Sequence, residues 1–425
     1  MSAGPNASRI SKVVVTPVAF ADPPLLNVVG VHQPWALRAI VELHTDTGLV
    51  GLGETYADET HLARLDAVAQ ALPGSDPYDT HGLRRLVVDV LGKETGGAGA
   101  SFGGMLDVSS AVDTVYSPFE VACLDLVARE AGRPVSDLLG GAVRDRVPFS
   151  GYMFYKWAGH PGQPDDDWGE ALNPEQIVAQ AKRLVEGWGF GSLKLKGGVF
   201  HPDEECAAIE ALRDAFPDLP LRLDPNGAWT PETSVKVAER LAGVVEYLED
   251  PTPGIEGMAQ VSARTDVPLA TNMCVIAFEH LKPAIAADAV QIVLSDHHLW
   301  GGLRQSALLG GITDTFGMGL SMHSNSHLGV SLAAMVHLAA ATPNLTYACD
   351  THYPWKTQDV VRPGVLDFSG GSITVPTGPG LGVELDRDLL GELHEQYLSC
   401  GVRRREDTVY MRSFEPDFTP NTSRW

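Results

Sequence analysis

The chain of 425 residues is 44% hydrophobic and 20% charged, and its 31 basic and 54 acidic side chains give a net charge of −23. These proportions are ordinary for a folded protein, and the acidic excess argues against nucleic acid or an anionic membrane surface as a partner. Five cysteines without a C-x-x-C pair argue against a disulfide framework or a structural zinc site, and because neither a signal peptide nor an apolar run of roughly 20 residues is present, we expect a cytoplasmic protein.

The first 145 residues are predicted to contain both strands and helices. Strands are expected at residues 13–19, 39–44 and 49–54. The last two form a hairpin, because Thr45-Asp46-Thr47-Gly48 between them has a glycine at the turn. Helical periodicity follows over about residues 61–91. Another helix is expected to begin at Ser117-Pro118-Phe119-Glu120, where a serine cap precedes a capping-box glutamate, and to end at Gly132. This segment therefore predicts an α+β domain.

From about residue 147 the pattern changes to strands that alternate with helices. Strands are expected at residues 192–196, 220–223, 245–248, 269–271, 289–294 and 319–322. Each except the last is followed by an amphipathic helical pattern, as at residues 231–242. This alternation predicts a parallel sheet. After residue 370 we expect turns and one late helix at residues 386–400, and the absence of a linker indicates that the two regions share an interface.

A polar residue stands at the carboxyl end of each predicted strand: Lys194 and Lys196, Asp224, Glu249, Asn272, Asp296 and His323. From Lys196 onward these residues are 28, 25, 23, 24 and 27 positions apart. One β/α unit of a barrel has about this length, so one polar side chain falls at each turn of the same rim, where barrel active sites lie. Singly, each could be a turn former or a helix cap. Because these polar residues recur once per strand, at the same end of each strand, a functional site is favoured.

Three of these residues have oxygen atoms suited to a metal ion. Asp224, Glu249 and Asn272 would together offer a charge of about −2, which suits a hard divalent cation whose other positions are filled by water or substrate. Magnesium is the expected ion. Zinc is disfavoured, because no histidine or cysteine is among the three.

Two candidate bases flank this metal site. Lys194 and Lys196 lie on one strand face, so each ammonium should lower the pKa of the other toward the range of a working base. The alternative is a solvated lysine pair. His323 follows Asp296 by one strand, and a carboxylate can orient an imidazole and raise its proton affinity. Around a closed barrel the two bases would approach the metal from opposite sides. This geometry suits proton transfer to either face of one carbon, or removal of a proton followed by protonation of a leaving hydroxyl.

These motifs resemble those of the enolase superfamily, glucarate dehydratase subgroup. The shared motifs are Lys194-x-Lys196, Asp224-x-Asn226, Glu249-Asp250-Pro251, Asn272, Asp296 and His323-Ser324-Asn325. The resemblance implies an α/β fold, a modified (β/α)7β TIM-type barrel at residues 146–380. It also implies an α+β capping domain at residues 1–145, completed by roughly residues 380–425.

The resemblance also implies roles for individual residues. Asp224, Glu249 and Asn272 would bind Mg²⁺, and Lys196 would be one base, assisted by Lys194, which would also contact the substrate carboxylate. His323, paired with Asp296, would be the second base and the acid that expels the leaving hydroxyl. Asn325 would help to hold the substrate or its enediolate. The implied substrate-binding residues are Asn27, His32, Ser101, Tyr152, Phe154, Asn226, His352 and Arg405.

The implied reaction removes the C5 proton of a hexarate, D-glucarate or a stereoisomer, and eliminates the C4 hydroxyl to give a 5-dehydro-4-deoxy product. Ser101 stands where the subgroup usually has threonine, and Ser295-Asp296-His297-His298 replaces Ala-Asp-Pro-His. Both departures could change which diacid fits. We expect a small acid-sugar substrate as the partner, no nucleic acid or membrane, and a homo-oligomer.

Other functions stay open. The same bases could serve an acid-sugar racemase or epimerase, and several histidines leave a metal-dependent hydrolase as a weaker alternative, although no glutamate follows His323 as an H-E-x-x-H motif requires. A catalytically silent sugar-acid binder would have no use for two bases. The glycine-rich residues 96–104 lack the G-x-G-x-x-G spacing of a nucleotide loop, and either a mobile lid or a surface loop is compatible with them.

Overall fold

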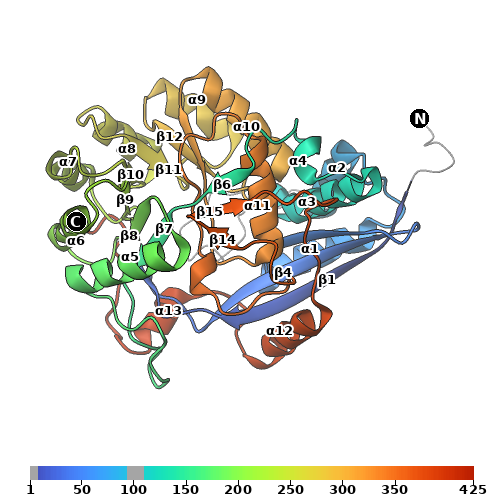
Figure 1. Cartoon of the computed structure of the whole chain (residues 1–425), viewed down its shortest axis with the longest axis horizontal. Coiled ribbons are helices and arrows are strands. Elements are labelled where there is room, and N and C mark those ends of the chain that lie inside the picture. Colours follow the sequence, from blue (N-terminus) through green and yellow to red (C-terminus); the bar gives the residue numbers. More distant parts are fainter. Residues whose placement is uncertain (1–7, 93–109) are drawn as a thin grey trace.

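A computed structural model describes residues 8–92 and 110–425 of the chain. Figure 1 shows two parts in contact, an N-terminal sheet with its helices and a ring of parallel strands with helices on its outer side. The glycine-rich segment of residues 96–104, for which a lid and a surface loop both stayed open, lies outside the described residues together with Ser101. Within the described part of the chain, no helix is long and apolar enough to cross a membrane.

The N-terminal part is built on an antiparallel sheet in the order β1-β4-β5. Its strands are β1 (Ile10–Ala21), β4 (Trp35–Thr45) and β5 (Val50–Tyr56). The predicted hairpin joins β4 to β5, and Gly48 in its turn has a φ of 86°, which glycine adopts without strain. On one side lie the helices α1 (Glu59–Ala71), α2 (Thr80–Leu91) and α3 (Ala111–Ala131).

The predicted start of α3 was wrong. The helix begins at Ala111, with Ser110 as its cap, and Pro118 lies inside it. Every residue from Thr114 to Ala128 is buried, so packing compensates for the backbone hydrogen bond that the proline cannot form. The Pro118 carbonyl oxygen would lie 2.1 Å from a Cβ atom placed on Gly53 of β5. Because glycine has no Cβ, α3 and β5 can approach this closely. The predicted end, at Gly132, is confirmed, because this residue is the left-handed C-cap.

The second part is a parallel sheet in which neighbours in space follow the order of the chain. Its strands are β7 (Gly151–Phe154), β8 (Leu193–Lys196), β9 (Leu221–Asp224), β10 (Tyr247–Glu249), β11 (Leu269–Thr271), β12 (Ile292–Ser295) and β13 (Gly319–Met322). Residues 346–350 close the ring, because the Asp350 N–H donates to the Met322 carbonyl at 2.8 Å and the Cys349 N–H donates to the Pro148 carbonyl at 2.9 Å. The chain therefore folds as the expected β/α barrel with a cap.

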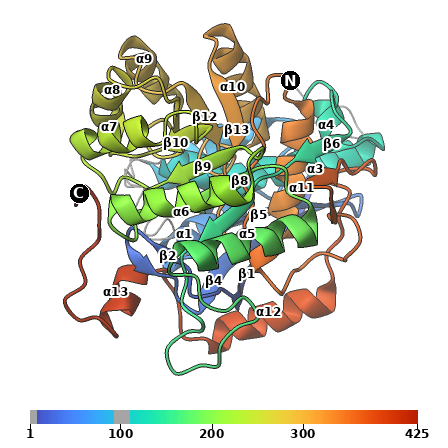
Figure 2. The same ribbon diagram turned by 60° about the vertical axis from the view of Figure 1, so that its left-hand side comes forward.

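Helices cover the outside of this barrel (Figure 2). They are α5 (Pro174–Trp188), α6 (Pro202–Ala215), α7 (Pro231–Arg240), α8 (Gly254–Ser262), α9 (Phe278–Ala286) and α10 (Leu303–Thr315). Another helix, α11 (Gly329–Ala341), follows β13, where no amphipathic helix was predicted. All of its residues are buried, so it has no polar face and shows no helical alternation of apolar and polar residues.

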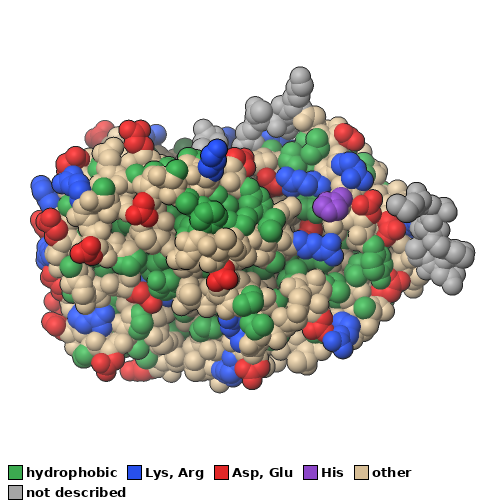
Figure 3. Space-filling model, turned by 90° about the horizontal axis from the view of Figure 1, so that it is seen from above, with side chains coloured by type: hydrophobic (Ala, Val, Ile, Leu, Met, Phe, Trp, Pro, Cys, Tyr) green, Lys and Arg blue, Asp and Glu red, His purple; other side chains and the backbone are tan. Residues whose placement is uncertain are grey.

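The C-terminal segment returns to the N-terminal part. The late helix α12 (Arg387–Ser399) lies along β1, where the His394 ring hydrogen-bonds the Pro17 carbonyl at 2.7 Å. A short helix that was not predicted, α13 (Asp407–Arg412), packs beside the β2–β3 turn of residues 26–31. On the face drawn in Figure 3, acidic and basic side chains are interspersed among the described residues.

Candidate active site

The side chains of the barrel strands alternate between the helices outside and the polar interior. On β8, Leu193 and Leu195 pack in the hydrophobic core, whereas Lys194 and Lys196 face Asp224 of β9. Because all these strands are parallel, their carboxyl ends meet at one rim. Asn272, Asp296 and His323 directly follow β11, β12 and β13 at this rim.

Lys194 is enclosed by carboxylates. Its Nζ lies 2.6 Å from Glu249 Oε2, 2.7 Å from Asp350 Oδ2 and 3.2 Å from Asp224 Oδ2. Burial alone would lower the pKa of Lys194, but the charges of Asp350 and Glu249 outweigh it and hold the pKa well above its ordinary value. The expectation that the two lysines depress the pKa of each other was therefore wrong for Lys194. The like charge of Lys196 on the same strand has less effect on this pKa than the carboxylates of β9, β10 and the segment that closes the barrel.

Lys196 is nearer to the open end of the barrel. Its Nζ donates to Asp224 Oδ2 at 2.9 Å and to Asn226 Oδ1 at 2.8 Å. Asn226 has a φ of 58°, a left-handed conformation in which asparagine is common, and this turn directs its amide back to the lysine. The two contacts hold the amine in one position at the rim.

The three predicted metal ligands each have a buried oxygen with no hydrogen-bond partner among the described residues: Asp224 Oδ1, Glu249 Oε1 and Asn272 Oδ1. Glu249 Oε2 also has no hydrogen-bond partner among these residues and forms an ion pair with Lys194. Burial and the charge of Asp224 raise the pKa of Glu249 well above its ordinary value. Unpartnered buried oxygens and a crowded carboxylate pair are costly without a cation. The residues therefore fit a divalent ion with oxygen ligands, the type of ion expected from the sequence.

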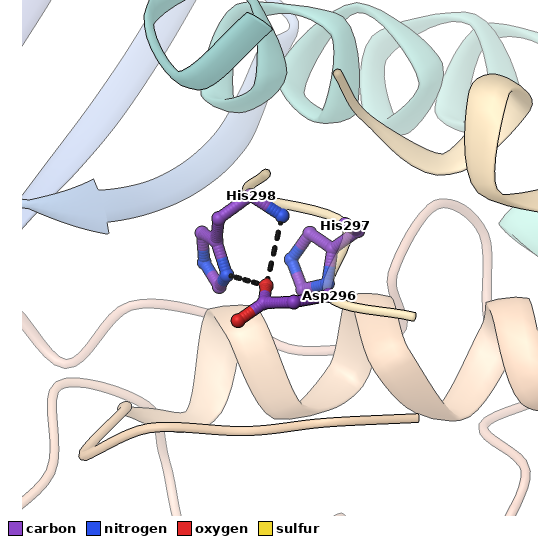
Figure 4. A group of neighbouring side chains, drawn as sticks. All are labelled: Asp296, His297 and His298. Atoms are coloured by element: carbon purple, nitrogen blue, oxygen red, sulfur yellow. Dashed lines mark hydrogen bonds and ion pairs between the residues drawn. The ribbon is translucent and has the colours of Figure 1, made fainter. Parts of the chain in front are cut away.

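His323 and Asp296 lie in contact on neighbouring strands. His323 Nδ1 is 3.1 Å from Asp296 Oδ2, while the other carboxylate oxygen, Oδ1, lies 2.7 Å from His298 Nδ1. Figure 4 shows this carboxylate turned toward the ring and backbone nitrogens of His298. Burial would raise the pKa of Asp296, but the two imidazoles outweigh it and hold the pKa well below its usual range. Asp296 is therefore an anion shared by two imidazole rings.

Asp296, His297 and His298 also bring possible ligand atoms within 4.8 Å of one another. His298 uses both ring nitrogens in hydrogen bonds, since Nδ1 contacts Asp296 and Nε2 lies 2.9 Å from Arg38 Nη2. An imidazole engaged in this way offers no lone pair to a metal ion. We therefore interpret this cluster as a hydrogen-bond network and assign the candidate metal position to the three unpartnered oxygens.

Several predicted substrate-binding residues adjoin the lysines. Tyr152 donates to Asp224 Oδ2 at 3.0 Å, and its ring lies 4.6 Å from that of Phe154 and 5.0 Å from that of His352. The His32 ring lies 6.1 Å from the Phe154 ring. These aromatic side chains form one buried wall beside the charged groups.

The remaining predicted residues lie on the cap side of the site. Asn27 and Arg405 both donate to Asp407 Oδ2, at 3.5 Å and 2.9 Å, and so join the N-terminal loop to α13. Asn325 donates to the Tyr56 hydroxyl at 3.1 Å. The structure thus links Asn325 to strand β5 of the cap.

Two important neighbours were not predicted as site residues. Asp350 contacts Lys194 from the segment that closes the barrel, and its position two residues before the predicted His352 was the available signal. Arg38 lies in the buried strand β4 among apolar residues, and a charged residue in such a strand was the available signal.

The fold and the geometry define a class of protein, a capped β/α barrel in which ammonium, carboxylate, amide and imidazole groups meet at one rim. Residues 176–389 match the family described as enolase C-terminal domain-like. The whole chain is 51% identical to the probable glucarate dehydratase of Streptomyces coelicolor, across 98% of this chain and 99% of that protein. The chain belongs to the enolase superfamily, as the resemblance implied.

Solved structures agree with this assignment. An enolase from Mycobacterium smegmatis, complexed with formate and acetate, is 65% identical over all of both chains and has a TM-score of 0.98. An enolase from Pseudomonas fluorescens with bound magnesium, potassium and tartrate is 51% identical over 99% of this chain and 100% of its own, with a TM-score of 0.95. Together with the similarity to the Streptomyces relative, these similarities support the assignment of this chain as an acid-sugar dehydratase.

Proposed function

We propose that this protein is a Mg²⁺-dependent dehydratase of a hexarate, D-glucarate or a stereoisomer, and that it forms a 5-dehydro-4-deoxy product. The main observation in favour is that Asp224, Glu249 and Asn272, which stand at the carboxyl ends of neighbouring strands as Lys196 and His323 do, each have a buried oxygen without a hydrogen-bond partner in the described part of the chain. The similarity to a probable glucarate dehydratase supports the choice of a six-carbon diacid.

When bound, the divalent cation would supply positive charge that stabilises the substrate carboxylate as its neighbouring carbon loses a proton. Lys196, oriented by Asn226, is positioned to exchange a proton at that carbon. His323 contacts Asp296 through Nδ1, which leaves Nε2 to exchange the second proton. Breaking the C–H bond releases a proton to one base, and breaking the C–O bond releases the hydroxyl as water with a proton from the acid.

A screen of hexarates and hexonates with Mg²⁺ in deuterated buffer tests this proposal. We expect a 2-keto acid from one or a few diacids, and loss of turnover by about 100-fold or more in Lys196→Ala, because general acid–base groups commonly contribute this much. Magnesium affinity of the variant should persist. Exchange of the α-proton without elimination would favour the racemase or epimerase. Unchanged turnover in the variant would contradict the role of Lys196 and favour hydrolysis.

The metal ligands can be tested without activity. Asn272→Leu removes one of the three unpartnered oxygens, so we expect Mg²⁺ affinity to fall by about 10- to 100-fold, a common effect of weakening a metal site. The measurement is the rise in Tm with Mg²⁺ concentration. Asn344→Leu is the control, since Asn344 contacts Thr313, which lies on α10. Equal Mg²⁺ responses in both variants would place the ion elsewhere.

A further inference from the structure

A chain of buried charged and polar groups leads from the cap to His323. Arg38 on β4 donates through Nε to Glu54 Oε1 on β5 at 2.9 Å, and its Nη2 lies 2.9 Å from His298 Nε2. His298 contacts Asp296, which contacts His323. All five side chains are nine-tenths or more buried.

The hydrogen-bond chemistry of Arg38 determines the protonation of His298. A guanidinium has donors and no acceptor, so His298 Nε2 must accept. The Ser331 hydroxyl oxygen lies 3.1 Å from the same nitrogen and 3.4 Å from His327 Nδ1. The ring proton therefore lies on Nδ1, which donates to Asp296 Oδ1 at 2.7 Å. A neutral His298 leaves the negative charge of Asp296 in place for His323.

We propose that Arg38 is a positioning residue, supplied by the cap, that keeps His298 neutral with its proton on Nδ1 and so preserves Asp296 as the anionic partner of His323. Without Arg38, Nε2 of His298 can take a proton. The resulting imidazolium would neutralise Asp296 and remove the charge that supports protonation of His323. The inference rests on the proposed function only where it gives His323 a role in proton transfer.

Glu54 fixes Arg38 and joins the cap to the barrel. Its carboxylate accepts the Leu328 N–H at 2.8 Å and the Ser331 N–H at 2.8 Å, and so caps the N-terminus of α11. The guanidinium carbon of Arg38 lies 4.5 Å from the centre of the Tyr56 ring, whose hydroxyl accepts from Asn325. The arginine is thus held on three sides, and docking of the cap determines the orientation of its Nη2 group.

The direct test is the tautomer of His298, read from the ¹⁵N shifts of histidine-labelled protein and assigned with His298→Gln. We expect Nδ1 protonated and Nε2 unprotonated at pH 7 in the wild type. In Arg38→Met, Nε2 should gain a proton. The activity of Arg38→Met should fall by about 10- to 100-fold, as for other residues that orient a reacting group. Arg38→Lys retains a donor-only cation, so it should keep the wild-type tautomer and recover part of the activity.

Arg129→Met is the matched control. This cap arginine also pairs with a buried carboxylate, Asp125, and its other partners among the described residues are the Val383 carbonyl and Glu384, not a histidine. It should lower stability and leave the His298 signals unchanged. An Arg38→Met protein that keeps the wild-type tautomer would overturn the proposal. A wild-type His298 with its proton on Nε2 would also overturn the proposal. This measurement does not depend on whether Arg38→Met folds. If the proposed function is wrong and this inference is right, His298 will have the expected tautomer, but the α-proton of the acid sugar will not exchange.

Discussion

Among individual residues, Lys194 has the densest set of charged neighbours, with three carboxylates within 3.2 Å of its ammonium. Removing one member of a buried ionic cluster leaves the others uncompensated, which typically costs about 3–5 kcal/mol. We expect Lys194→Met to lose about this much free energy of unfolding in EDTA. Magnesium should restore part of the loss, because a cation at Asp224 and Glu249 would neutralise the same carboxylates. Urea unfolding with and without Mg²⁺ measures both effects.

Lys156→Met is a suitable control for this prediction. Lys156 is as fully buried as Lys194, but its ammonium contacts Asp166 and two backbone carbonyls outside the candidate site. The control should be destabilised to the same degree with or without Mg²⁺. An equally metal-insensitive loss in Lys194→Met would argue that the carboxylates around Lys194 do not hold the ion.

For individual residues, the sequence was more informative about which side chains lie at the same rim than about the direction of their pKa shifts. Regular spacing predicted that Lys196, Asp224, Glu249 and Asn272 would stand at one rim, because β/α units repeat at a nearly constant length. The direction of the pKa shift of Lys194 depends on Asp350, which is brought beside it only by closure of the barrel. A local pattern contains no signal for such a contact.

Among the elements, the first turn of α6 contains a buried carboxyl group, Glu205, that the mechanism does not use. Glu205 Oε1 accepts the Val199 and Phe200 N–H groups at 2.9 and 3.1 Å. Burial raises the pKa of Glu205 to about 7, from an ordinary value of 4.5. A raised carboxyl pKa stabilises the fold fully below the unfolded-state value, and this contribution is lost as the pH rises through about 7.

We therefore expect Glu205→Gln, which matches the neutral form in size, to flatten this pH dependence. The wild type should lose about 2–3 kcal/mol relative to the variant between pH 4.5 and pH 8, which corresponds to the pKa shift. Urea unfolding across this pH range measures the difference. Glu204→Gln, at the exposed neighbouring position, should follow the wild-type curve. Parallel curves for the wild type and Glu205→Gln would show that Glu205 is ionised throughout.

The elements were predicted well where polar or turn-forming residues bound a short run, and poorly where tertiary packing decides. Strands β11 and β13 begin and end at the residues predicted for them. Helix α11 was missed because it is apolar on every side, and the first turns of α3 were missed because Ser117 and Pro118 form a helix-start pattern inside a buried helix. Burial of this kind becomes visible only when the partner element is known.

Over the whole molecule, residues of the C-terminal segment bridge the cap and the barrel rim. The Asn421 N–H donates to the Val28 carbonyl at 2.8 Å, next to the predicted substrate-binding Asn27. Its Nδ2 donates to the Gly198 and Val199 carbonyls, at 2.9 and 3.2 Å, in the loop that follows Lys196. One buried residue thus connects, through its backbone N–H and its side-chain amide, a loop of the cap with the loop beyond a predicted base.

Asn421→Leu keeps the size of this side chain but removes its donor. Two carbonyls of the barrel loop would lose a partner, so we expect a loss of about 1–3 kcal/mol in the free energy of unfolding. Because the loops adjoining Asn27 and Lys196 would no longer be held together, KM for the acid sugar should rise by roughly tenfold, with a smaller change in kcat. Asn344→Leu should leave KM unchanged, since Asn344 contacts Thr313, which lies on α10. An unchanged KM in Asn421→Leu, despite a measured loss of stability, would mean that the cap and the barrel rim keep their relative position without this bridge.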